Sequence, residues 1–311
     1  MTHQAQQDIE QEFQIDVRLI ISEIWNKKFF ISIITSIFSV IAVIYSLNLP
    51  NVYKSQALLK TSEEESSSAS LLSQYGNVAN FAGIQLPQSN SDNQANMAVA
   101  ILKSRSFLKH LIDIDPSISQ FLMASESYDV DKRTIHFDPS KFDSEKNKWV
   151  REPKKGVSIT PSYLEVHEHF MDIFKADIDQ ESGFIRLSVE HISPDFAESL
   201  LRLTISELNN ITRNDDINSS QSALEYLYNE ASKNTVTSIE FSISKLIESQ
   251  LQTQMMAQIE PNYFLNIIDE PFRPEVKSSP NRRSICIISF LAGLIFSSLY
   301  VVVSFIYRKE K

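Results

Sequence analysis

The chain has 311 residues and is acidic, with 29 Lys and Arg against 39 Asp and Glu and a formal net charge of −10 at pH 7. It has no dense basic tract with interleaved aromatic residues, which argues against a protein that binds nucleic acid. The single cysteine, Cys286, excludes an intramolecular disulfide and a cysteine-based zinc cluster. The five glycines form neither a GxGxxG motif nor a Walker loop, so phosphate sites of those kinds are not expected.

Two long uncharged apolar segments lie near the ends of the chain, at residues 29–49 and 284–307. A helix needs roughly 20 apolar residues to cross the hydrocarbon core of a bilayer, and both segments reach that length. They predict two transmembrane helices that flank one extramembrane domain at residues 50–283. The first segment begins far into the chain and lacks a small-x-small cleavage site before Pro50, so we expect it to be retained and not removed as a signal peptide.

Basic residues beside the two segments predict the orientation of the chain. Those on the terminal sides are Lys27, Lys28, Arg308, Lys309 and Lys311. Because positive residues stay on the cytoplasmic side, both tails, residues 1–28 and 308–311, are expected in the cytoplasm. Arg282 and Arg283 oppose this orientation, but a large domain is translocated largely regardless of its charge. In a bacterium with two membranes, residues 50–283 would then lie in the periplasm.

Short elements are predicted in the first third of the chain. Residues 15–25 show an amphipathic helical pattern, expected at the inner membrane surface, and residues 52–60 are typical of a strand. The acidic tract 61–70 is expected to be a solvated loop that continues through 71–92, because a calcium loop needs spaced ligands and a turn glycine. Residues 93–111 carry an apolar stripe near the helical period and predict one helix.

The middle of the chain alternates between unclear and clear patterns. Residues 113–161 are mixed and predict no particular element. Residues 163–174 predict an amphipathic helix. Residues 176–179 and 184–192 predict two strands of a hairpin that turns at 181–183, since apolar and polar residues alternate along the second strand.

A long helical region is predicted between Pro194 and Pro261, which enclose neither glycine nor proline. Ser193 is a good cap and Pro194 fits the first helical turn. One straight helix of about 66 residues would span about 100 Å. The polar tract 214–220 could interrupt it, and with or without that turn we expect an elongated helical arm. Residues 262–269 predict a strand that returns toward the membrane.

No pattern in the sequence predicts catalysis, a cofactor or a metal site. His167 and His169 stand two residues apart, about 200° around a helix, whereas helical metal ligands favour the i, i+4 spacing. No GxSxG motif accompanies the many serines. We therefore expect no catalytic, cofactor-binding or metal-binding residues, and the protein is not expected to be an enzyme.

Two features near the second apolar segment are more informative. Pro271, Pro274 and Pro280 predict a stiff, extended re-entry segment, although a plain linker is an equal alternative. Ser289, Gly293 and Ser297 stand at i, i+4 and i+8, where a ridge of small residues lets membrane helices approach closely. Chance placement of small residues is the alternative. In the first span, Ser32, Ser36 and Ser39 could form a matching strip.

Four stretches together resemble the Wzz polysaccharide co-polymerases, the chain length determinants of lipopolysaccharide O-antigen. The stretches are Leu49–Leu59 (LPNVYKSQALL), Asn80–Ile84 (NFAGI) with Ala100–Leu108 (AILKSRSFL), Ser193–Ala197 (SPDFA), and Phe264–Arg283 (FLNIIDEPFRPEVKSSPNRR). They resemble, in order, the family's exit from its first span, the block that follows, the start of its long helix and its proline-rich re-entry. Each is weak alone, but their order and the two flanking spans make the resemblance specific.

The chain departs from the family pattern at two points. Ser297 stands where the family often carries a second glycine in its small-residue ridge, which bears on the strength of the helix contact. Some relatives carry a fused cytoplasmic tyrosine kinase, whereas this sequence ends at Lys311, so kinase activity is not expected. Arg282 and Arg283 fit the family, which often places basic residues there.

The resemblance implies an α+β fold in which two transmembrane helices flank a periplasmic domain with a small mixed sheet and a long helical arm. It implies a homo-oligomeric ring that works beside the O-antigen polymerase, contacts the growing lipid-linked polysaccharide and sets its length without an active site. A subunit of a capsule or exopolysaccharide export system is an alternative. A two-span periplasmic sensor is another, and it would need a partner protein to receive its signal.

Overall fold

The computed structural model describes residues 17–62, 91–152, 156, 158–233, 237–260 and 262–309. The chain forms two compact units. One joins Met1–Asn51 to Ser278–Lys311, and the other comprises Val52–Lys277. Most of the predicted loop at 61–92 lies outside the described residues.

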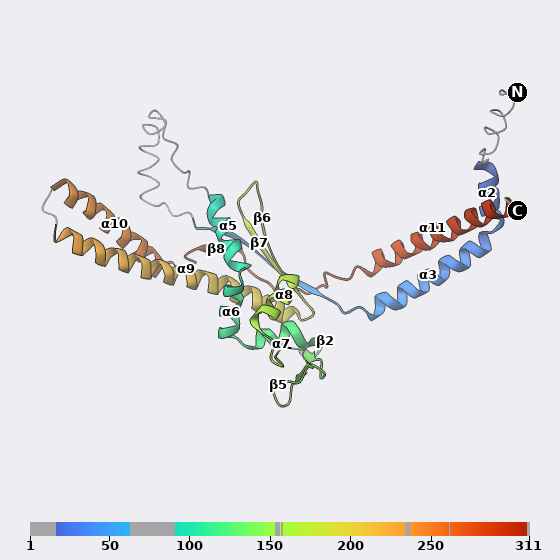
Figure 1. Cartoon of the computed structure of the whole chain (residues 1–311), viewed down its shortest axis with the longest axis horizontal. Helices are drawn as coiled ribbons and strands as arrows, with labels where there is room; N and C mark the ends of the chain where they lie inside the picture. Colours follow the sequence, from blue (N-terminus) through green and yellow to red (C-terminus); the bar gives the residue numbers. More distant parts are fainter. Residues whose placement is uncertain are drawn as a thin grey trace, which may run out of the picture. The chain divides into compact units, whose positions relative to one another are not determined.

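The first unit is built from three helices, α2 (Val17–Asn26), α3 (Lys28–Asn48) and α11 (Arg282–Lys309). Helices α3 and α11 run antiparallel and side by side (Figure 1). Both are long and apolar enough to cross a membrane. Only 17% of the apolar stretch of each helix is buried, whereas the core helix of a soluble protein is mostly buried. They coincide with the two predicted spans within a few residues. Helix α2 matches the predicted amphipathic segment and packs on α11.

The second unit contains a four-stranded sheet in the order β6-β7-β1-β8. The strands are β1 (Tyr53–Thr61), β6 (Phe174–Ile178), β7 (Ile185–His191) and β8 (Leu265–Asp269). All three pairings are antiparallel, so the α+β class is confirmed while the sheet is antiparallel and not mixed. Strand β1 lies inside the sheet, and its alternate residues from Tyr53 to Thr61 are buried. The predicted strands at both ends of the domain, and the predicted hairpin, are confirmed.

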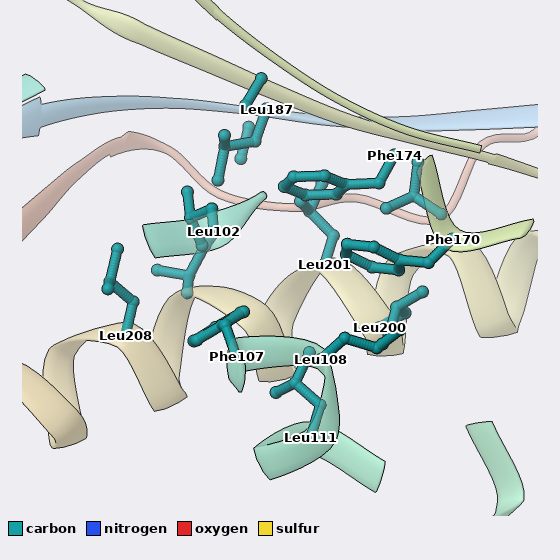
Figure 2. Packing of buried hydrophobic residues seen from close by; sticks show 14 of the residues in the cluster. Leu102, Phe107, Leu108, Leu111, Phe170, Phe174, Leu187, Leu200, Leu201 and Leu208 are labelled. Atoms are coloured by element: carbon teal, nitrogen blue, oxygen red, sulfur yellow. The ribbon is translucent and has the colours of Figure 1, made fainter. Parts of the chain in front are cut away.

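Helices pack on the sheet and close one hydrophobic core (Figure 2). These are α5 (Ser91–Leu102), α6 (Arg105–Ile114), α7 (Ser117–Ala124), α8 (Tyr163–Ile173) and the first part of α9 (Pro194–Ala231). Fully buried side chains reach this core from four of these helices and from strands β6 and β7. They are Leu102, Leu108, Phe170, Phe174, Leu187 and Leu201. Burying side chains of this size contributes about 1.5–3 kcal/mol each, which makes this core the main source of stability in the unit.

The prediction of a single helix at 93–111 is wrong, because the helix is interrupted at Ser104. The backbone of Ser104 is extended, and its hydroxyl accepts a hydrogen bond from the Phe107 amide at 3.1 Å. This is the geometry of a helix N-cap, and it ends α5 at Leu102 and starts α6 at Arg105. The apolar stripe continues across the break because both helices face the same core.

The region that predicted no element, 113–161, contains α7 and two small hairpins. They pair β2 (Ser125–Asp129) with β3 (Thr134–Phe137), and β4 (Phe142–Asp143) with β5 (Lys148–Trp149). Aspartates hold the turns, because the Asp129 and Asp143 carboxylates each accept backbone N–H groups two and three residues further on. Strands of two to five residues are too short for a periodic pattern to reveal.

The long helical region is a hairpin of two helices. Helix α9 continues without interruption through the polar tract 214–220 and ends at Ala231, and α10 (Thr237–Ile259) packs back along it (Figure 1). Of the two alternatives for the polar tract 214–220, the structure therefore has the uninterrupted helix. Polar residues such as Asn214 and Asp215 sit on the exposed face, while Ser220 and Leu224 are buried against the second helix. The predicted start is confirmed, since the Ser193 hydroxyl caps the helix at the Phe196 amide and Pro194 occupies the first turn.

Asn209 on α9 holds the chain that returns from the arm. Its side chain is 4% exposed. Its carbonyl oxygen accepts hydrogen bonds from the amides of Phe264, at 3.0 Å, and Leu265, at 2.7 Å, and its amide donates to the Leu265 carbonyl at 3.2 Å. The side chain thus satisfies backbone groups at the start of β8 that would otherwise be buried without partners.

We expect Asn209→Ala to lower the free energy of unfolding by about 2–4 kcal/mol, because it leaves buried backbone groups unpaired. Asn210→Ala is the matched control, since Asn210 is exposed and should change it by about 0.5 kcal/mol or less. Thermal unfolding of the full chain in detergent, followed by Trp149 fluorescence in a Trp25→Phe background, measures both. Equal effects of the two substitutions would contradict the proposed role of Asn209 in holding the start of β8.

His191, at the end of β7, is held as a neutral ring. Its Nε2 donates to the Phe121 carbonyl at 3.1 Å, and its Nδ1 accepts from the Ser193 amide at 3.1 Å. A proton on Nδ1 would point at the N–H group of Ser193, which is also a donor. Burial lowers the pKa of His191 from 6.5 to about 4, although its bond to the Phe121 carbonyl favours the charged form.

Because the folded pKa of His191 lies below the unfolded one, the unfolded state takes up the proton first as the pH falls. The contribution of neutral His191 to the free energy of unfolding is therefore fully present above pH 6.5. It is lost between pH 6.5 and about 4, by an amount on the order of 3 kcal/mol. We expect His191→Gln to flatten this part of the curve of melting temperature against pH. His136→Gln, at an exposed position on β3, should leave the curve unchanged.

Candidate functional site

The contact between α3 and α11 is formed by small residues on both helices. On α11, Gly293, Ser297 and Val301 are buried at i, i+4 and i+8. On α3, the buried residues are Thr35, Ala42 and Ser46. Two pairs of aromatic rings flank this strip: Phe38 and Phe296 are stacked with centroids 6.4 Å apart, and Phe30 and Tyr300 are tilted with centroids 5.7 Å apart.

Gly293 is the point of closest approach. A Cβ atom added there would lie 3.0 Å from the Phe38 Cβ and 3.3 Å from the Thr35 Cα. The Thr35 hydroxyl donates to the Ile31 carbonyl at 2.8 Å, and the Ser297 hydroxyl to the Leu294 carbonyl at 3.1 Å, each within its own helix. The helices are therefore held by van der Waals packing, the usual basis of small-residue contacts in membranes.

The structure brings together part of the predicted ridge but not its predicted partner strip. Gly293 and Ser297 face α3 of the same chain, and Ser289 is half-buried on the same side. On α3, however, Ser32 and Ser36 are exposed. Ser39 is half-buried, and the fully buried residues of α3 are instead Thr35, Ala42 and Ser46. Sequence spacing alone does not reveal which face of α3 meets α11.

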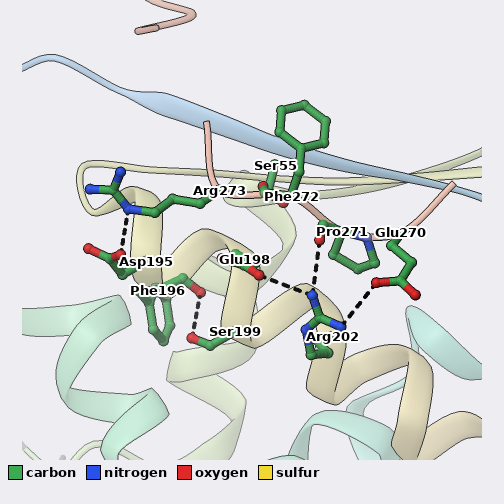
Figure 3. A network of polar contacts seen from close by, with 10 residues as sticks. All are labelled: Ser55, Asp195, Phe196, Glu198, Ser199, Arg202, Glu270, Pro271, Phe272 and Arg273. Carbon is green, nitrogen blue, oxygen red and sulfur yellow. Dashed lines mark hydrogen bonds and ion pairs between the residues drawn. The ribbon is translucent and has the colours of Figure 1, made fainter. Parts of the chain in front are cut away.

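The re-entry segment contains no helix and no extended strand, and polar contacts tie it to the start of α9 (Figure 3). The Arg273 Nε donates to the Asp195 carboxylate at 2.6 Å. Arg202 donates to the Pro271 carbonyl at 3.2 Å and pairs with Glu198 and Glu270 at 3.1 and 3.6 Å. These contacts set the segment apart from a plain linker.

Strand β1 holds the same segment from the other side. The Ser55 hydroxyl donates to the Phe272 carbonyl at 2.7 Å (Figure 3). Pro271 and Pro274 are buried, whereas Pro280 is half-buried and belongs to the unit of membrane helices. Because proline has no N–H donor, the Pro271 backbone can take part in this network only through its carbonyl oxygen, which accepts from Arg202.

Asp195 is the charged centre of this network. Burial alone would raise the pKa of Asp195, but hydrogen bonds from the Tyr128 hydroxyl, at 2.5 Å, and from Arg273 hold it below its ordinary value. Burial and the bond to Asp195 raise the pKa of Tyr128. The pair therefore stays a carboxylate and a neutral phenol at physiological pH, and Arg273 retains its anionic partner.

The arm exposes large apolar side chains that the sequence pattern did not single out as a surface. On α10 they are Phe241, Leu246, Leu251, Met255, Met256 and Ile259, each at least 38% exposed. Several of them line a shallow groove of about 450 Å³. Helical periodicity identifies apolar faces but does not distinguish one packed on α9 from one left open. Apolar patches of this kind on a monomer commonly mark contact surfaces.

The histidine pair occupies the surface of α8. The His167 Nε2 lies 2.9 Å from the Lys103 carbonyl, and His169 is exposed. Within the part of the chain that the structure describes, no three His, Cys, Asp or Glu side chains form a group that could hold a metal ion.

Comparison with known proteins identifies a family for the first third of the chain. Residues 13–114 match the family model "Chain length determinant protein" (Wzz). This match confirms the resemblance indicated by the motifs for the part of the chain that it covers, which includes α3, β1, α5 and α6. No curated protein matches the chain.

Two solved structures show distant likeness. A full-length bacterial polysaccharide co-polymerase is 12% identical, with a TM-score of 0.40, covering 95% of this chain and 98% of its own. A fragment of WzzB, a polysaccharide co-polymerase from Salmonella Typhimurium, is 13% identical, with a TM-score of 0.29, covering 74% of this chain and 100% of its own.

Gly293→Leu should separate α3 from α11, because even a Cβ atom at that position would crowd Phe38 and Thr35. In a Cys286→Ser background, Phe30→Cys and Tyr300→Cys provide thiols where two rings now touch. We expect Gly293→Leu to lower the yield of that disulfide at least fivefold, measured on a denaturing gel after cleavage at a protease site inserted next to Lys233. Ser36→Leu adds a comparable side chain at an exposed position and should leave the yield unchanged. Full cross-linking in Gly293→Leu would show that the glycine is dispensable.

Proposed function

We propose that this protein is an oligomeric regulator of polysaccharide chain length in a bacterial inner membrane, and that it acts without catalysis beside the O-antigen polymerase. The match of residues 13–114 to the chain length determinant family carries this proposal. The two apolar helices that flank one folded unit support it, because each is long and apolar enough to cross a membrane.

The proposed orientation places both termini in the cytoplasm and the Val52–Lys277 unit in the periplasm. Lys27 and Lys28 at the start of α3, and Arg308 and Lys309 at the end of α11, support it through the positive-inside rule. Arg282, which opposes the rule, has a structural role where α11 begins and α3 ends. Its guanidinium donates to the Leu49 carbonyl at 3.4 Å and to Asn51 at 3.2 Å, where α3 ends.

The proposed oligomer is a ring of identical chains. The open apolar face of α10 supports it, because a second copy would cover side chains such as Met255 and Ile259 that one chain leaves exposed. Ser289, Gly293 and Ser297 remain candidates for helix contacts in the membrane, and Pro271, Pro274 and Pro280 for the connection between arm and membrane. In this proposal the polymerase and the growing lipid-linked polysaccharide are the partners.

Deletion of the gene tests the function directly. We expect the banding pattern of lipopolysaccharide on a gel to lose its preferred length, while some polymer is still made, because the polymerase remains. Complementation with the intact gene should restore the preferred length. An unchanged pattern after deletion would count against the proposal, and loss of polysaccharide export with unaltered length would favour an export subunit.

A further inference from the structure

A groove in the second unit has no role in the function proposed above. It has a volume of about 530 Å³ and lies among Phe121 of α7, the β2–β3 hairpin and the first turns of α9. This volume is in the range of small-molecule sites. All its walls belong to the same compact unit.

Three phenylalanine rings form the inner surface of the groove. Phe196 is 7% exposed, and Phe121 and Phe137 are half-buried. The ring centroids of Phe121 and Phe196 are 4.6 Å apart, and those of Phe121 and Phe137 are 5.6 Å apart. The rings hold one another in place, so they offer a preformed apolar surface at little cost in conformational entropy.

Polar groups from three parts of the chain surround these rings. Arg133 and Thr134 come from the β2–β3 hairpin, Ser199 from α9, and Asp115 from the segment before α7. Arg133, Thr134 and Ser199 are exposed. Together they offer both donors and acceptors of hydrogen bonds.

The charges around the groove nearly cancel. Asp195 also lines it, but its carboxylate is paired with Arg273 at 2.6 Å. Asp115 and Arg133 carry opposite charges. Such a balance offers no net attraction to a polyanion, and a wholly apolar ligand would remove the exposed polar groups from water without replacing their hydrogen bonds.

We propose that this groove binds a short segment of a glycan chain, with a sugar's C–H face on the phenylalanine rings and its hydroxyls on the surrounding polar groups. A sugar ring combines one apolar face with hydroxyls that both donate and accept, which is the combination this groove presents. The inference rests on the proposed function for its source of glycan, namely the polymer whose length the protein regulates.

The groove also adjoins the network of the re-entry segment. Asp195 lines the groove, and its Oδ1 accepts a hydrogen bond from Arg273 of the re-entry segment. A bound glycan would therefore lie next to the contact that ties this segment to α9.

The test uses the full chain in detergent and, as the probe, oligosaccharides released by mild acid from the surface polysaccharide of the bacterium that carries the gene. Ligand-observed NMR titration gives the Kd. Ser199→Trp fills the groove from an exposed helix position, and Ser222→Trp, at an exposed position further along α9, is its matched control. Arg133→Asn removes the guanidinium, and asparagine tolerates the positive φ of 53° found there.

We expect saturable binding to the wild type, a Kd at least tenfold higher for Ser199→Trp, at least threefold higher for Arg133→Asn, and unchanged for Ser222→Trp. Absence of saturable binding, or equal Kd values for all four proteins, would overturn the proposal. So would a loss of oligomer mass in Ser199→Trp with glycan binding intact, because the groove would then hold a second copy of the chain.

The outcome is separable from that of the gene deletion. If deletion alters the length distribution while the purified protein binds no oligosaccharide, the groove assignment fails and the function stands. If the protein binds through the groove but deletion changes nothing, the function fails and the groove stands.

Discussion

The antiparallel pairing of β1 with both β7 and β8 is the constraint on which the larger unit depends. Strand β1 follows the first apolar helix, and β8 precedes the second, so this pairing joins the beginning and the end of the unit in one sheet. Everything between β7 and β8 must leave the sheet and come back to it. The helical hairpin satisfies that requirement, and Asn209 fixes the point of return by binding the backbone where β8 begins.

The polar network of the re-entry segment extends this constraint beyond the sheet. Arg202 and Asp195 lie on the first three turns of α9, and they bind the chain immediately after β8. Ser55 of β1 binds it from the other side. Hydrogen bonds thereby hold three parts of the chain together: the base of α9, strand β1 and the re-entry segment. A displacement of the base of α9 would have to break these bonds or carry the segment with it.

The sequence was sufficient to predict those elements whose conformation depends only on a few neighbouring residues. The uncharged apolar runs identify α3 and α11, and Ser193 with Pro194 marks the start of α9 because capping is a property of a few adjacent residues. Packing decides the features that the sequence did not reveal. The polar tract at 214–220 remains helical because Ser220 and Leu224 are buried against α10. The face of α3 that meets Gly293, and the groove lined by Phe121 and Phe137, arise from residues far apart in the chain.

The two-helix arm has a consequence for how its length can vary. Helix α9 has 38 residues and spans about 57 Å, whereas α10 has 23 residues and spans about 35 Å. Both are held at the base, so extra turns in one helix alone would shift the contacts beyond the insertion out of register. A change in the length of the arm that preserves these contacts therefore requires compensating insertions or deletions in both helices, in steps close to whole helical turns, and the sheet at the base can stay the same.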